Sequence, residues 1–95
     1  MTTDLKALWQ EAFGDPPVFV DNFFATGYSP ERCRYIYTSE QLACALYWFD
    51  VYQDGRKLAY LYAVATAKSL QNKGYCRRLL QHTHQQLKRQ GYSGA

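Results

Sequence analysis

Apolar residues near the start of the chain recur at helical spacing. One stripe repeats every three or four residues and consists of Leu5, Leu8, Trp9, Ala12 and Phe13. This spacing places its members on one face of an amphipathic helix, which Gly14 ends. A second, shorter helix is predicted around Val20, Phe23 and Phe24, closing near Gly27. Asp15 is a candidate N-cap for it, with Pro16 at the first helical position.

From Arg32 onward the pattern becomes that of β-strands. The segments RCRYIYT (32–38), LACALYWFDVY (42–52) and LAYLYAVAT (58–66) are rich in aromatic and β-branched residues, as strands are. Asp54-Gly55 between the second and third segments is a strong hairpin signal. The third segment is apolar at successive positions, which predicts a strand covered on both faces.

The end of the chain returns to helical spacing. A second apolar stripe consists of Cys76, Leu79, Leu80, Thr83 and Leu87. Basic and amide side chains occupy the opposite face, and Gly91 is a natural helix stop. The predicted order is therefore two helices, three antiparallel strands and a helix, forming a single domain over residues 1–95.

Composition narrows the class of protein. A hydrophobic fraction of 47% and an aromatic fraction of 17% exclude a disordered chain. The net charge of +3 permits an anionic ligand but does not favour nucleic acid, which takes a denser basic stripe. The N-terminus lacks the pattern of a signal peptide, and no apolar run reaches the ~20 residues of a membrane span. A cytoplasmic protein without a membrane partner is expected.

The cysteines point to neither a metal site nor disulfides. Cys33, Cys44 and Cys76 lack metal-ligand spacing. Each lies within an apolar pattern, so we interpret them as reduced, mostly buried side chains.

The most distinctive segment is QNKGYCRR, residues 71–78, between the third strand and the last helix. The first N–H groups of a helix have no intrahelical partner and lie at the positive end of its dipole, so they can bind phosphate. Gly74 would let the backbone approach an anion closely, and Lys73, Arg77 and Arg78 would attract it. The alternative is a glycine needed only for loop geometry, with solvated basic neighbours.

Residues 71–76, QNKGYC, resemble the [QR]-x-x-G-x-[GA] loop of the GNAT superfamily of acyl-coenzyme A N-acyltransferases. The preceding YAVAT (62–66) and the element order are similar to the first half of that fold, and LWQEAFGD (8–15) resembles a bacterial subgroup. Cys76 stands where the family usually has Gly or Ala. The resemblance implies an α/β (α+β) GNAT-like fold. It also implies a further strand, helix and hairpin after Gly91, so this chain is expected to be a truncated, N-terminal part.

The resemblance also implies a site. Acetyl-CoA would be the co-substrate, with no metal, its pantetheine arm beside the third strand and its diphosphate on the loop. The cofactor-binding residues would be Val64, Ala65, Thr66, Gln71, Asn72, Lys73, Gly74, Tyr75, Cys76 and Arg77. The family's usual acid is a tyrosine on a helix after the fifth strand, so the catalytic residues stay unassigned. Asp50 could face a substrate amine or simply water.

Two functions follow. The resemblance implies an N-acetyltransferase, or its acetyl-CoA-binding half, acting on an amine of a small molecule, a protein N-terminus or a lysine. The alternative is a non-catalytic interaction module that uses the basic C-terminal helix. An uncovered edge of strand 58–66 would recruit another chain, which predicts a homodimer.

Overall fold

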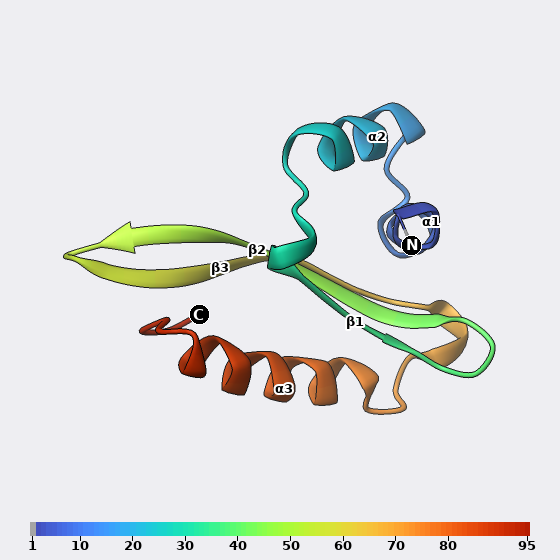
Figure 1. Ribbon diagram of the computed structural model, residues 1–95. Helices are drawn as coiled ribbons and strands as arrows, with labels where there is room; N and C mark the ends of the chain where they lie inside the picture. The colour runs from blue at the N-terminus through green and yellow to red at the C-terminus, as the bar shows by residue number, and fades with distance from the viewer. Residues whose placement is uncertain (1) are drawn as a thin grey trace.

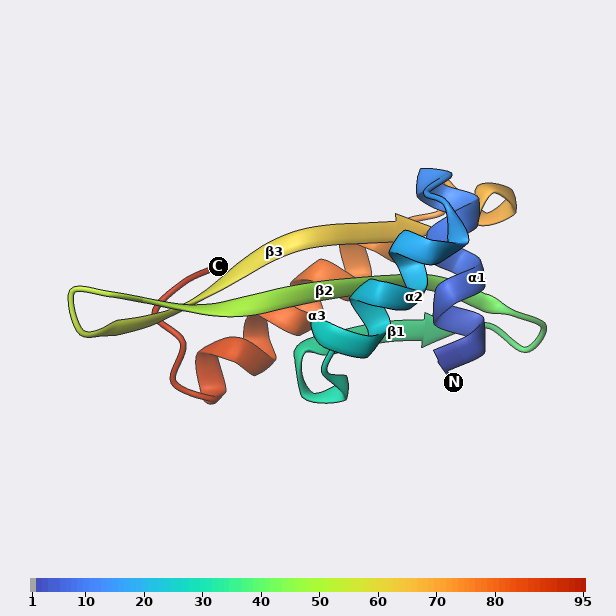
Figure 2. The ribbon, with the colours of Figure 1, turned by 90° about the horizontal axis from the view of Figure 1, so that it is seen from above.

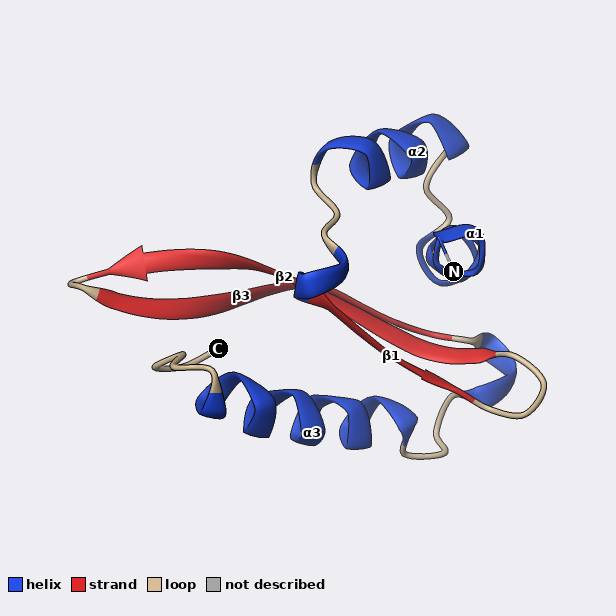
Figure 3. Ribbon diagram, in the orientation of Figure 1, coloured by secondary structure: helices blue, strands red, loops and turns tan. Residues whose placement is uncertain are grey.

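The computed structural model describes residues 2–95 and has the predicted order of elements (Figures 1 and 3). Its helices and strands are α1 (Thr2–Phe13), α2 (Pro17–Thr26), β1 (Cys33–Tyr37), β2 (Leu42–Gln53), β3 (Arg56–Thr66) and α3 (Tyr75–Arg89). Two short 3-10 turns, Pro30–Arg32 and Lys68–Leu70, precede β1 and follow β3. None of the helices between residues 2 and 95 has the length and apolar character needed to span a bilayer.

The strands form an antiparallel sheet in the order β1-β2-β3. Asp54 and Gly55 connect β2 and β3 with φ angles of 52° and 75°, the left-handed values that a two-residue hairpin turn requires. The hairpin prediction is therefore confirmed. Residues 58–66 pack against helices on both faces, as predicted, with Ala63 and Ala65 in the core under α1 and Leu61 and Val64 in the core under α3, but the cover is incomplete. Every residue from Leu42 to Trp48 on central β2 is buried, whereas on β3 only Ala59 and Ala65 are. β3 is an edge strand, so its apolar residues are only partly covered.

The helices cover opposite faces of this sheet. α1 and α2 lie on one face and α3 on the other, while the tip of the β2–β3 hairpin projects beyond α1 and α2 (Figures 1 and 2). Each face has its own core. Leu5 and Leu8 of α1 pack with Ala45 and Tyr47 against one side. On the other side, α3 contributes Leu79 and Leu87 to a core with Cys44, Leu46 and Trp48.

The start of α2 differs from the prediction. Pro16, with ψ of 146°, is the N-cap, and Pro17 opens the helix. The reason is the Pro-Pro pair, because a residue that precedes proline is driven out of the helical region. Asp15 instead accepts a hydrogen bond of 2.8 Å from the indole N–H of Trp9.

The segment after α3 returns to the outer edge of β3. The Ala59 N–H donates to the Gly94 carbonyl (2.9 Å), and the Ser93 N–H donates to the Lys57 carbonyl (2.7 Å). Local chain thus covers the part of the edge near the hairpin, and the part from Tyr60 to Thr66 has no strand beside it among residues 2–95. The homodimer through this edge stays a prediction, and light scattering at high concentration checks it.

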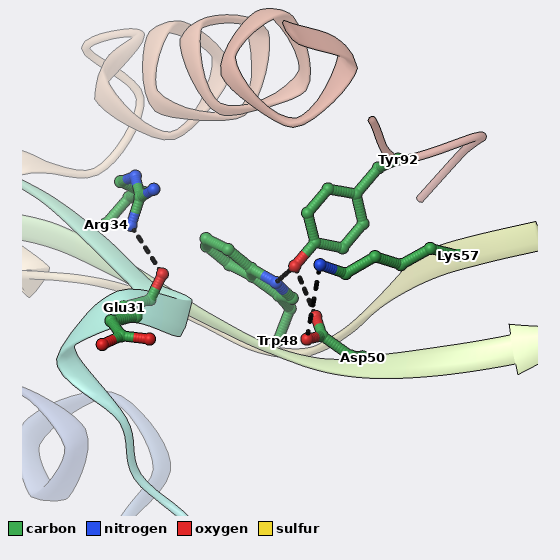
Figure 4. Close-up of polar contacts among 6 residues, drawn as sticks. All are labelled: Glu31, Arg34, Trp48, Asp50, Lys57 and Tyr92. Atoms are coloured by element: carbon green, nitrogen blue, oxygen red, sulfur yellow. Dashed lines mark hydrogen bonds and ion pairs between the residues drawn. The ribbon is translucent and has the colours of Figure 1, made fainter. Parts of the chain in front are cut away.

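A polar network anchors the same segment (Figure 4). The hydroxyl of Tyr92 accepts a hydrogen bond from the Trp48 indole (3.2 Å) and donates one to Asp50. The Lys57 ammonium lies 3.9 Å from the Asp50 carboxylate and 4.5 Å from the centroid of the Tyr92 ring. The sequence allowed Asp50 to face either a substrate amine or water. In the structure its carboxylate instead contacts Tyr92 and Lys57 and helps to hold the C-terminal segment against β2.

One buried hydroxyl gives a stability prediction. Tyr47 is 1% exposed, and its hydroxyl has no hydrogen-bond partner among residues 2–95. A buried polar group without a partner costs about 1–3 kcal/mol. Tyr47→Phe keeps the ring in the α1 and α2 core, so it should raise the free energy of unfolding by about 1 kcal/mol. Urea denaturation measures the change, and a lower midpoint for the variant would show that the hydroxyl has a partner in solution.

Candidate functional site

The loop before α3 has an unusual backbone. Asn72 and Gly74 adopt left-handed conformations, with φ of 65° and 83°, on either side of Lys73. Gly74 is also the N-cap of α3, and no side chain caps the helix. Backbone that passes through left-handed residues can turn neighbouring N–H groups toward one side, which makes a concave site for an anion.

The first N–H groups of α3 are unpaired. Among the described residues, the first backbone N–H of α3 that donates to a carbonyl is that of Arg78, to Gly74 (3.0 Å), so those of Tyr75, Cys76 and Arg77 have no intrahelical partner. These donors lie at the positive end of the α3 dipole. The local fold therefore offers a run of unpaired donors next to a residue without Cβ, as phosphate binding requires.

A groove of about 800 Å³ begins at this loop. It lies between the end of α1, the end of β3 and one side of α3. Of the residues predicted from the sequence, the structure brings eight together in its lining: Val64, Thr66, Gln71, Asn72, Gly74, Tyr75, Cys76 and Arg77. A volume of this size is in the range of ligand sites.

Ala65 and Lys73 fall outside the groove. Ala65 is 1% exposed and packs in the core beneath α1, because successive strand residues point to opposite faces. Lys73 is exposed and lines none of this groove. The two arginines that the sequence placed near the ligand lie on different sides of α3. Arg77 lines the groove, whereas Arg78 places its guanidinium 5.2 Å from the centroid of the Tyr75 ring and lines a cavity on the β1 side.

A bulge in β3 directs backbone groups into the groove. Tyr47 pairs with Ala63 and Trp48 with Leu61, so Tyr62 is an extra residue. Beyond the bulge, the Ala67 N–H donates to the Ala43 carbonyl of β2 (2.8 Å). Since N–H and C=O groups alternate in direction along a strand, those of Val64 and Thr66 point away from β2. The uncovered edge of β3 thus presents them beside the groove.

Sequence reasoning missed part of the lining. Ala12 and Phe13 of α1 also line the groove, and Leu80, Gln81 and His84 line it along α3. Leu80 and His84 follow Cys76 at intervals of four, so the helical period could have found them. No local signal places Phe13 there, because its position depends on how α1 packs across the sheet.

The structure does not single out a catalytic tyrosine. Burial raises the pKa of Tyr47 and of Tyr62 above the ordinary value, since the charged phenolate loses its hydration. Both rings pack against Phe23 in the aromatic cluster under α2, so their packing in the core accounts for them without a catalytic role. Within residues 2–95, no three or more histidine, cysteine or acidic side chains come together as metal ligands.

The cysteines differ in a way that alkylation can measure. All three are free thiols, and burial raises the pKa of Cys33 to about 12 and of Cys44 to about 11. Since the thiolate is the reactive form, both should resist iodoacetamide at pH 8 in the folded protein. Cys76 is half-buried at the groove and should react first. Mass spectrometry of the digested protein checks this order, and equal labelling of all three would contradict it.

Comparison with known proteins shows the family of this chain. The chain matches the family model of the acetyltransferase (GNAT) domain over residues 2–95. Among curated protein sequences, none matches it.

Three solved structures share the fold. An aminoglycoside acetyltransferase from an uncultured soil metagenomic sample has a TM-score of 0.74 at 17% identity, over 99% of this chain and 67% of that one. The ribosomal-protein-alanine N-acetyltransferase of Brucella melitensis biovar Abortus has a TM-score of 0.75 at 9% identity, over 98% and 70%. A Trypanosoma brucei acetyltransferase has a TM-score of 0.66 at 13% identity, over 99% and 75%.

These identities show a common fold alone, whereas the family match spans all the described residues. The chain that carries this loop and groove therefore belongs to the GNAT acetyltransferase family.

Proposed function

We propose that this protein transfers an acetyl group from acetyl-CoA to an amine, with the diphosphate of the co-substrate on the N–H groups of residues 71–77. The observation that carries the proposal is this run of unpaired donors at the start of α3. A diphosphate needs several convergent donors, and a helix N-terminus beside a left-handed glycine provides them. Arg77, which lines the same groove, adds a positive charge.

The edge of β3 suits the pantetheine arm. This arm contains two amide bonds, so it can pair with an exposed strand edge as a peptide does. Val64 and Thr66 line the groove beyond the bulge, and their outward backbone groups are the partners we propose. Ala65 and Lys73 leave the proposed contact set, because the structure places both outside the groove.

The chemistry required of the protein is modest. Acetyl-CoA supplies the acetyl group as an activated thioester. The chain must hold that thioester, exclude water, and transfer one proton from the amine to the leaving thiolate. An unprotonated amine then attacks the acetyl carbon, and a backbone N–H near the β3 bulge is a candidate donor to the negative oxygen. One such preorganised donor contributes roughly 3–4 kcal/mol.

The acceptor is proposed only as a class. The names of the similar structures include acetyltransferases for aminoglycosides and for a ribosomal protein, and both kinds of acceptor carry amines. An amine of a small molecule, a protein N-terminus or a lysine fits the proposed reaction. No observation in residues 2–95 favours the interaction-module alternative over it.

The direct test is binding of coenzyme A. Saturation at 100 times the dissociation constant should add about 2.7 kcal/mol to stability, which thermal unfolding detects. Bound coenzyme A should also protect Cys76 from iodoacetamide, because Cys76 lines the groove beside the loop. Pantetheine, which lacks the diphosphate, should give neither effect at the same concentration. Absence of both effects at millimolar coenzyme A would refute the proposal.

A further inference from the structure

We propose that His84 is a catalytic residue that gives a proton to the thiolate leaving from acetyl-CoA. This inference rests on the function proposed above. His84 lies on α3 and lines the same groove as Gly74 and Val64. It also lines an adjoining cavity of about 250 Å³, bounded by Leu87, Tyr92 and the C-terminal segment. His84 therefore stands where the loop groove meets a second opening.

The length of the groove supports this placement. His84 is ten residues after Gly74, and a helix rises 1.5 Å per residue, so the two lie about 15 Å apart along α3. A pantetheine arm has about twelve bonds between its phosphate oxygen and its sulfur, as many as four extended residues, which span roughly 13–14 Å. An arm anchored at the loop would thus bring its sulfur level with His84.

Counting along β3 instead of α3 places the sulfur at a similar height in the groove. Counting back from Thr66 at about 3.3 Å per residue, the same length reaches the region of Tyr62, where β3 bulges. Gly74, at the start of α3, lines the groove together with Thr66, and Ser93, just after α3, donates to the Lys57 carbonyl. α3 thus runs back along β3, and His84, just past the middle of the helix, lies level with the middle of the strand, where the bulge is.

The chemical surroundings leave His84 as the suitable proton donor. Among the described residues that line the groove there is no carboxylate and no second histidine. The other ionisable groups there, Tyr75, Cys76 and Arg77, lie at the loop end, and Lys88 lies on the next turn of α3 beside the second cavity. Imidazole changes protonation near neutral pH, as a general acid in this reaction must.

The proposed step balances as follows. The amine nitrogen forms a bond to the acetyl carbon, and the carbon–sulfur bond breaks with its electron pair on sulfur. The His84 imidazolium gives its proton to that sulfur, yielding the thiol. The proton that the amine loses returns to the imidazole, so no other reactant is consumed.

His82 is a matched control on the same helix. It is two residues away, which places it about 200° around the helix axis. There it contacts Gln86 at 3.3 Å and lines a cavity with Ile36 and Arg78 on the β1 side. Both histidines are exposed, so substituting either should leave the fold intact.

Imidazole ¹⁵N NMR of the folded protein, with coenzyme A or desulfo-coenzyme A, tests the placement. Coenzyme A should shift the ring resonances of His84 and not those of His82. Desulfo-coenzyme A should shift the Gly74 amide equally but His84 less. A Gly74 response with an unmoved His84 would overturn this inference and leave the proposed function standing. No response at Gly74 would overturn both.

Steady-state kinetics test the role. His84→Gln should lower kcat for acetyl transfer about 100-fold and leave the KM for acetyl-CoA unchanged, while His82→Gln keeps both. A kcat for His84→Gln equal to that of His82→Gln would show that His84 transfers no proton.

Discussion

Replacing Gly74 by valine should weaken the binding of coenzyme A about 100-fold. Gly74 has a φ of 83°, where a β-branched residue is a genuine outlier. The strained loop would relax to a negative φ and turn its N–H groups away from one another. Losing two charge-assisted hydrogen bonds at the lower end of their range, about 1.5 kcal/mol each, already amounts to a factor of this size. Isothermal titration calorimetry measures the change.

Gly91→Val is the control for strain alone. Gly91 has a φ of 91° and, like Gly74, has no other atom within 4 Å of an added Cβ. It follows the other end of α3, far from the loop along the helix. Both variants should therefore lose similar stability, about 1–3 kcal/mol, and only Gly74→Val should lose affinity. Equal affinities in the two variants would show that the loop does not bind the diphosphate.

The elements were predictable because each has a strong local signal. The stripe that includes Leu5 and Leu8 has helical spacing, and Asp54-Gly55 encodes its own turn. The start of α2 was predicted wrongly because Asp15 is a good cap in isolation. The effect of Pro17 on Pro16 decided the outcome instead.

The lining of the candidate site was predictable where it is local and not where it depends on packing. Residues 71–77 are contiguous, so the loop could be proposed from its sequence. Ala65 lies outside the groove because its side chain faces the α1 core, which a strand pattern apolar on both faces does not reveal. The bulge at Tyr62 and the approach of Phe13 arise only when strands and helices pack, so neither has a signal in the sequence around it.

Trp48→Ala should have the largest effect on stability, a loss of about 3–5 kcal/mol. Trp48 is 1% exposed at the centre of the core beneath α3, and the Arg34 guanidinium lies 4.9 Å from its ring centroid. Since small domains are stable by only about 5–15 kcal/mol, urea denaturation should show a large shift. Tyr60→Ala, at a side chain 62% exposed on the same hairpin, should change stability by less than about 0.5 kcal/mol.

The same substitution should release the C-terminal segment. Trp48 donates to Tyr92, which reaches Asp50 and keeps residues 92–94 against β3. Without the indole, hydrogen exchange should speed up first at the Ala59 and Ser93 amides, which join this segment to the strand. Exchange at Ala67, bonded to β2 at the far end of the sheet, should follow only the global loss of stability. If Ala59 and Ala67 accelerated equally, the network would be part of the general core and would hold no segment of its own.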